Sequence, residues 1–111
     1  MDKIKKYSEA IIKLIRDYGK FSPVNRPDTE TQVIIDAINH HYLIYLVGWK
    51  DEDTRIHDCY LHIDIKEDGK IWIQYNGFDR DMEEEFEELG IDNNDVVLGF
   101  YSESYREMLT L

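Results

Sequence analysis

Hydrophobic residues at the start of the chain recur at steps of three and four. Glycine follows the last of them, and glycine commonly ends a helix. This spacing places one apolar stripe along a helix. We therefore predict an amphipathic helix over residues 2 to 18, with its buried face formed by Ile4, Tyr7, Ile11, Leu14, Ile15 and Tyr18.

The period of the pattern changes from 3.6 to 2 between Thr29 and Tyr75, which is typical of strands. Before this region we predict an extended connector over residues 21 to 28, because two prolines there exclude further helix. Polar breaks at residues 39–41, 50–53 and 67–69 divide the region into four runs. We predict four antiparallel strands that follow one another in a meander, with Gly69 supplying a positive φ in the last turn.

The third of these strands alternates strictly over residues 54 to 65, so the pattern assigns its side chains to two faces. One predicted face carries Ile56, Asp58, Tyr60, His62 and Asp64, and the other carries His57, Cys59, Leu61, Ile63 and Ile65.

The helical period returns after Asn76-Gly77, where the sheet region ends. Met82, Phe86 and Leu89 form one apolar stripe on an acidic helix that ends at Gly90. The apolar pattern of residues 95 to 100 predicts a short edge strand, and Ser102 is a suitable cap for a last helix. The whole order predicts an α+β fold in one domain over residues 1–111: an N-terminal helix, an antiparallel sheet of about four to five strands, and C-terminal helices packed on one face.

The charge of the chain restricts its partners. The 111 residues carry a net charge of −11, divided as +3 over residues 1 to 20, −5 over 21 to 78 and −9 over 79 to 111. Proteins that bind nucleic acid by its phosphates need a basic face, so direct contact with DNA or RNA is disfavoured. No signal peptide or long apolar run is present, and the single Cys59 suits a reducing cytoplasm.

Several groups of residues are candidate chemical sites. His57 and Cys59 share a predicted face and could offer two zinc ligands, but a structural zinc site needs four, and a buried thiol is the simpler interpretation. His40 and His41 fall in a predicted polar turn.

A carboxylate beside an imidazole can perform acid–base chemistry, and Asp58, His62 and Asp64 share the other predicted face. A polar outer face explains that set at least as well. Pro27-Asp28 followed by Asp64-Ile65-Lys66 matches a PD-(D/E)xK metal nuclease, but such matches arise by chance in an acidic chain. We assign no catalytic, cofactor or metal residues from the sequence.

The acidic helix offers a surface for a basic partner. Glu84, Glu87 and Glu88 flank its apolar stripe, and complementary charge accelerates association and suppresses wrong pairing. A solvated helix face is the simpler explanation of the same residues.

Ordered short motifs along the chain resemble the XisI family, the fdxN element excision controlling factors of cyanobacteria. They are Val47-Gly48-Trp49, His62-Ile63-Asp64-Ile65, Asp68-Gly69-Lys70-Ile71-Trp72-Ile73-Gln74, Leu89-Gly90-Ile91 and residues 95–100. The resemblance covers residues 7 to 106. The residues that carry it are expected to be structural, and they are Gly48, Trp49, His62, Asp64, Gly69, Lys70, Trp72, Gln74, Gly90, Asp95, Gly99 and Phe100.

The resemblance implies a small accessory protein that acts with an XisH-like partner to control excision of a DNA element by the recombinase XisF during heterocyst differentiation. It implies no catalytic residues and no cofactor. We therefore predict a non-enzymatic cytoplasmic regulator that works through protein contacts, including contacts with copies of itself.

Three alternatives remain open. The acidic surface could mask the groove of a nuclease-like partner, as an antidote does. The +3 N-terminal helix could bind DNA directly, and the metal nuclease is the third possibility. The basic residues of the DNA-binding alternative are Lys3, Lys5, Lys6, Lys13 and Arg16.

Overall fold

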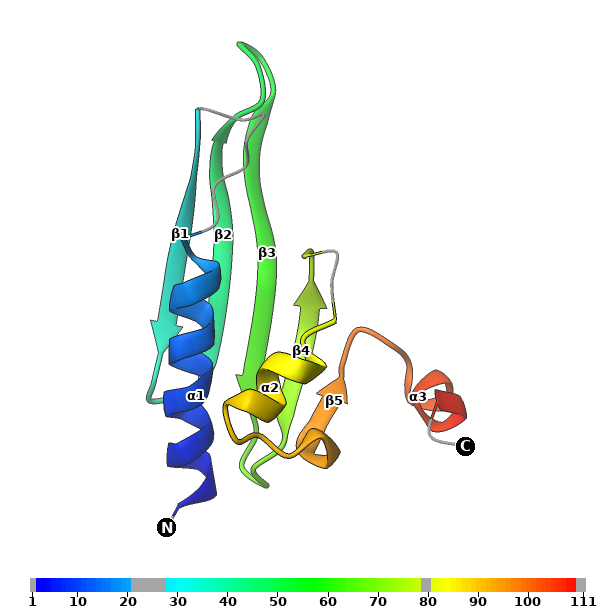
Figure 1. The fold of residues 1–111 in the computed structure, drawn as a ribbon. Helices are drawn as coiled ribbons and strands as arrows, with labels where there is room; N and C mark the ends of the chain where they lie inside the picture. Colours follow the sequence, from blue (N-terminus) through cyan, green and yellow to red (C-terminus); the bar gives the residue numbers. More distant parts are fainter. Residues whose placement is uncertain (1, 21–27, 79–80, 110–111) are drawn as a thin grey trace.

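The fold is described from a computed structural model, which places residues 2–20, 28–78 and 81–109. Residues 21–27 of the predicted connector lie outside the described residues. Figure 1 shows the sheet with α1 and α2 against it and α3 beyond its last strand. The elements in chain order are α1 (Lys3–Tyr18), β1 (Thr29–Asp36), β2 (His41–Trp49), β3 (Arg55–Ile65), β4 (Ile71–Asn76), α2 (Glu83–Glu88), η1 (Asn93–Asp95), β5 (Val96–Leu98) and α3 (Glu103–Leu109).

The sheet has five strands in the order β1-β2-β3-β4-β5. The first four pair antiparallel, which confirms the predicted meander. The fifth is an edge strand as predicted, but it pairs parallel to β4, so the sheet is mixed. A parallel neighbour needs a crossover, and α2 with η1 supplies it between the two strands.

A β-bulge in β3 changes the predicted assignment of its two faces. Ile44 pairs with Leu61, while the next residue of β2, Tyr45, pairs with Cys59, so Tyr60 has no partner on β2. An extra residue of this kind shifts the alternation by one position. Residues directly opposite in an antiparallel pair share a face. One face therefore carries Ile56, Asp58, Leu61, Ile63 and Ile65, and the other carries His57, Cys59, His62 and Asp64.

The core lies between the first of these faces and the helices. α1 contributes the residues that its pattern predicted, among them Ile11 and Ile15, which are fully buried. The helix ends before Gly19 as predicted, but that glycine has an ordinary φ of −67°. Its role is close packing, because a Cβ there would lie 2.3 Å from Cγ2 of Val33. From α2, Phe86 joins the same core at 1% exposure.

Polar contacts join α1 to the C-terminal part of the chain. The Tyr7 hydroxyl donates to Oδ2 of Asp95 at 2.6 Å and accepts from the backbone N–H of Asp92 at 3.3 Å. Lys3 Nζ lies 3.0 Å from the same Asp95 oxygen. The basic helix and the acidic segment therefore partly neutralise each other within the fold.

The last helix is placed differently from α2. The cap predicted at Ser102 is present, since its Oγ accepts from the backbone N–H of Tyr105 at 3.3 Å. None of the residues of α3 is buried. Arg106 instead lies over the ring of Trp72, 5.2 Å from its centre, which is on the face of the sheet that α1 leaves open. The predicted packing of the C-terminal helices on one face therefore describes α2 and not α3.

Candidate functional site

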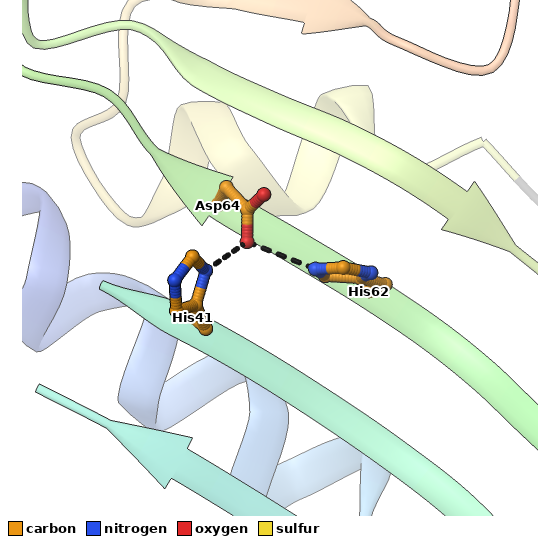
Figure 2. Close-up of side chains that lie close together, drawn as sticks. All are labelled: His41, His62 and Asp64. Carbon is orange, nitrogen blue, oxygen red and sulfur yellow. Dashed lines mark hydrogen bonds and ion pairs between the residues drawn. The ribbon is translucent and has the colours of Figure 1, made fainter. Parts of the chain in front are cut away.

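Three side chains from two neighbouring strands converge on the open face of the sheet: His41, His62 and Asp64. Figure 2 shows His41 at the start of β2 and the other two on β3. Register explains the cluster, because His41 pairs directly with Asp64 and residues two apart on a strand share a face. We call these three residues the His–Asp cluster.

The turn between β1 and β2 sets this register. The side chain of Asp36 accepts hydrogen bonds from the backbone N–H groups of Ile38 and Asn39, both at 3.0 Å. His40 then adopts a positive φ of 62°, and its carbonyl accepts from the N–H of Ile65 at 3.1 Å. Short polar side chains stabilise tight turns in this way. The turn therefore fixes the first residue of β2 against the end of β3.

Asp64 is the centre of the cluster. Its Oδ1 lies 2.7 Å from Nδ1 of His41 and 2.9 Å from Nε2 of His62. Its Oδ2 accepts a hydrogen bond of 3.2 Å from the Gln74 amide. The Asp64 side chain is 9% exposed, whereas those of His41 and His62 are 49% and 32% exposed. A nearly buried carboxylate thus lies at the base of two accessible imidazoles.

The pKa of the Asp64 carboxyl is lower than usual. Burial on its own would raise this pKa, but the hydrogen bonds from His41 and Gln74 and the interaction with His62 outweigh it. The carboxylate is therefore held in its charged form. An anionic oxygen beside two imidazole nitrogens is a suitable donor set for a cation.

A second bulge and a close glycine position the residues around the cluster. The partner of His62 on β4 is Tyr75 and that of Ile63 is Ile73, so Gln74 is the extra residue. A Cβ at Gly99 would lie 2.7 Å from Oε1 of Gln74. The backbone at Gly99 therefore approaches Gln74 closely, and the segment after β5 packs against the amide that contacts Asp64.

Several other motif residues also occupy the places that their types suggest. Gly69 has φ 85° in the β3–β4 turn, and Gly90 has φ 82° after α2. A Cβ at Gly48 would lie 2.1 Å from the carbonyl oxygen of Asp28, so this position needs a glycine for close approach. Trp49 does not pack in the core; it is 44% exposed and contacts Arg55.

The structure separates some candidates that the sequence placed together. Asp58 lies on the opposite face from His62 and Asp64, because the bulge at Tyr60 reverses the alternation. His57 and Cys59 do share a face, yet neither belongs to a possible metal-ligand group among the described residues. The predicted buried thiol is wrong, because Cys59 is only partly buried and the bulge places it on the opposite face from Leu61 and Ile63. Its partial burial still raises the pKa of the thiol, which lowers its reactivity.

The nuclease motif is not assembled. Asp28 lies at the Trp49 end of β2, where its carbonyl accepts from the Trp49 N–H at 3.3 Å. Asp64 lies opposite His41 at the other end of that strand. Eight residue steps along β2 separate the two positions by roughly 26 Å, so they cannot share one metal ion. Pro27, the first residue of the motif, lies outside the described residues.

The acidic surface is present on α2. Glu84, Glu87 and Glu88 are exposed, while Phe86 between them is buried. Asn93 donates to Glu87 at 3.0 Å, and neither of the other two glutamates forms an ion pair with any residue that the structure describes.

Sequence reasoning missed His41 as a member of the site. The polar residues 39–41 predict a turn, whereas His41 is the first residue of β2. The available signal was register: pairing the second predicted strand with the third, with the intervening turns closed tightly, brings the start of one beside the end of the other.

No helix in the described part of the chain is long and apolar enough to cross a membrane.

Comparisons with known proteins give a consistent result. The chain matches the family model described as XisI protein over residues 1–110. A search of the curated proteins finds no match. The crystal structure of a XisI-like protein from Anabaena variabilis ATCC 29413 has 38% identity and a TM-score of 0.83, covering 95% of this chain and 94% of that chain. The fdxN element excision controlling factor XisI from the same organism has 31% identity and a TM-score of 0.81, covering 96% and 95%.

Proposed function

We propose that this chain, which belongs to the XisI family, is a non-enzymatic accessory protein that controls site-specific excision of a DNA element through contacts with other proteins. Its chief partner is an XisH-like protein, and the wider assembly includes a recombinase. The observation that carries the proposal is the match along almost the whole chain to a family in which one solved relative is named an excision controlling factor.

The acidic surface on α2 supports a protein partner with a basic face. The segment from residue 79 to residue 111 has a net charge of −9, and α2 presents its glutamates to solvent. Charge complementarity of this kind increases association rates and selects the partner.

A second surface, at the C-terminus, supports contacts through apolar groups. The aromatic rings of Phe100, Tyr101 and Tyr105 pack in sequence, with neighbouring centres 4.6 and 4.7 Å apart. Contiguous exposed apolar groups on a small protein mark interaction sites. We call the following exposed set the C-terminal apolar surface: Phe100 (44%), Tyr101 (38%), Tyr105 (43%), Met108 (64%) and Leu109 (53%). Self-association through this surface is part of the proposal.

The experiment mixes the purified protein with a purified XisH-like protein and measures binding by calorimetry and size-exclusion chromatography. We expect a complex at micromolar concentration. Simultaneous reversal of Glu84, Glu87 and Glu88 to Lys should weaken it. The control reverses Glu52 and Asp53, two exposed acids of the β2–β3 turn, and should leave binding unchanged. Absence of a complex, or equal losses from both sets, would contradict the proposal.

The exposed glutamates also favour a narrower version, in which the protein is an antidote that inhibits a nuclease-like partner. An anionic row on a helix can occupy a groove that otherwise binds phosphates. Incubating the partner with plasmid DNA in the presence and absence of this protein tests the idea. We expect the partner alone to cleave the plasmid DNA. The wild-type protein should prevent this cleavage, and the α2 reversal variant should not.

Direct DNA binding through α1 receives less support. Lys3 is paired with Asp95, and the helix buries its apolar face in the core. A gel-shift assay at low salt should therefore show no retardation of DNA by this protein alone.

A further inference from the structure

We propose that His41, His62 and Asp64 bind one divalent transition-metal ion of borderline softness, for which Zn²⁺ is the reference ion. The candidate ligand atoms of the three residues all lie within 4.8 Å of one another. Imidazole nitrogen and carboxylate oxygen contact Zn²⁺ at about 2.0–2.2 Å, so donors around one tetrahedral ion lie about 3.3 Å apart. The separations of 2.7 and 2.9 Å from Asp64 to the two histidines need to increase by about half an ångström. The two histidine nitrogens, which lie within 4.8 Å of each other, need to approach by at most about 1.5 Å.

The protein holds these donors on paired strands and not on a loop. His62 and Asp64 are separated by one residue on β3, and His41 lies opposite Asp64 on β2 (Figure 2). Backbone hydrogen bonds between the strands therefore fix the relative positions of all three side chains. A site arranged in advance in this way loses little conformational entropy when an ion binds.

Gln74 has the role of a supporting residue for the ion. Its amide donates to Oδ2 of Asp64 at 3.2 Å, which orients the carboxylate and turns Oδ1 toward the histidines. Hydrogen bonds to ligand carboxylates are a common feature of metal sites, and their loss typically weakens binding about 10–100-fold. The close approach of Gly99 to the Gln74 amide keeps that group in place.

The exposure of the cluster leaves a path for the ion. Asp64 forms a nearly buried base, while His41 and His62 face solvent and leave coordination positions for water. To bind the ion, Nδ1 of His41 and Nε2 of His62 must be unprotonated and offer a lone pair. Each neutral ring then carries its proton on its other nitrogen. The hydrogen bonds to Asp64 also satisfy the carboxylate without metal, and the experiment separates these two roles.

The test titrates the full chain, with any affinity tag removed, with Zn²⁺ by calorimetry and with Co²⁺ by visible absorption. We expect one ion per chain. His41→Gln and His62→Gln should each reduce affinity at least about tenfold, and Gln74→Ala about tenfold. Two matched controls, His57→Gln and Cys59→Ser, alter donors that share the face but lie outside the cluster, and should leave affinity unchanged.

The variants are chosen so that folding does not obscure the result. Glutamine at position 62 can still donate to Asp64, and circular dichroism of each variant confirms the fold. The Co²⁺ complex should show visible d–d bands without a thiolate charge-transfer band. Absence of stoichiometric binding at millimolar Zn²⁺, undiminished affinity in His62→Gln, or a thiolate band that disappears in Cys59→Ser would overturn the proposal.

Discussion

Removal of one hydroxyl, in Tyr7→Phe, measures how strongly the C-terminal segment is held to α1. Tyr7 is 4% exposed, and its hydroxyl donates to the Asp95 carboxylate at 2.6 Å. Phenylalanine keeps the ring, so the change removes the hydrogen bond without opening a large cavity. A hydrogen bond to a charged group contributes about 1.5–3 kcal/mol, and we expect the free energy of unfolding to fall by about 2 kcal/mol at neutral pH. For 111 residues this corresponds to a melting temperature lower by roughly 9 °C.

The pH dependence gives a second, independent measurement on the same pair. The hydrogen bond from Tyr7 is the largest cause that lowers the pKa of the Asp95 carboxyl; burial opposes it, and Lys3 adds to it. A carboxyl with a lowered pKa in the folded state stabilises the protein fully above its unfolded pKa of about 4, and this contribution is lost as the pH falls through the folded pKa. The difference in the free energy of unfolding between wild type and Tyr7→Phe should therefore become smaller in acid.

Urea unfolding followed by circular dichroism gives the free energy of unfolding of both proteins at pH 7 and at pH 3. Tyr75→Phe is the control, because it deletes the same atom from a ring that is 50% exposed and should change stability by less than about 0.5 kcal/mol. The reasoning is refuted if Tyr7→Phe matches this control at neutral pH, or if its cost is as large in acid as at neutral pH.

Three further predictions concern the core, a glycine and the cysteine. Phe86→Ala should cost about 3–5 kcal/mol in thermal or urea unfolding because the ring is 1% exposed, whereas Glu84→Ala on the same helix should stay within about 0.5 kcal/mol. Gly48→Ala should be more destabilising than Gly90→Ala, since its methyl group would meet backbone atoms at 2.1 and 2.7 Å while that of Gly90 would meet only a lysine side chain; equal losses in urea would be inconsistent with this. Cys59 should react with a thiol reagent more slowly in the folded protein than in urea, because burial raises its pKa, and equal rates would contradict the burial.

The sequence was informative wherever local rules act alone. The stripe along α1, the positive φ of Gly69 and the cap at Ser102 follow from side-chain periodicity and turn chemistry, and the structure has all three. The number of strands and the antiparallel order of the first four follow from the same reasoning, because short turns leave only one way to connect them.

The features that escaped prediction depend on pairing between strands. The bulges at Tyr60 and Gln74 depend on which residues of neighbouring strands lie opposite each other. The alternation of hydrophobic and polar residues in one strand does not specify that pairing. The direction of β5 depends on the path of the chain through α2. The pairing of His62 with Asp64 follows from their spacing, but His41 was missed for the same reason as the bulges, because it belongs to the His–Asp cluster only once its partner across the sheet is known.

Because of the bulge at Tyr60, β3 tolerates the deletion of a residue less well than the exposed turns do. Loss of a single residue there would restore strict alternation and rotate one half of the strand by half a turn relative to the other. Either His62 and Asp64 would enter the core in place of Leu61 and Ile63, or Ile56 would move to solvent. Homologues that differ in length are therefore expected to carry their insertions and deletions in the turns, and a gap placed at this position in an alignment would mark an error of alignment and not a change in the protein.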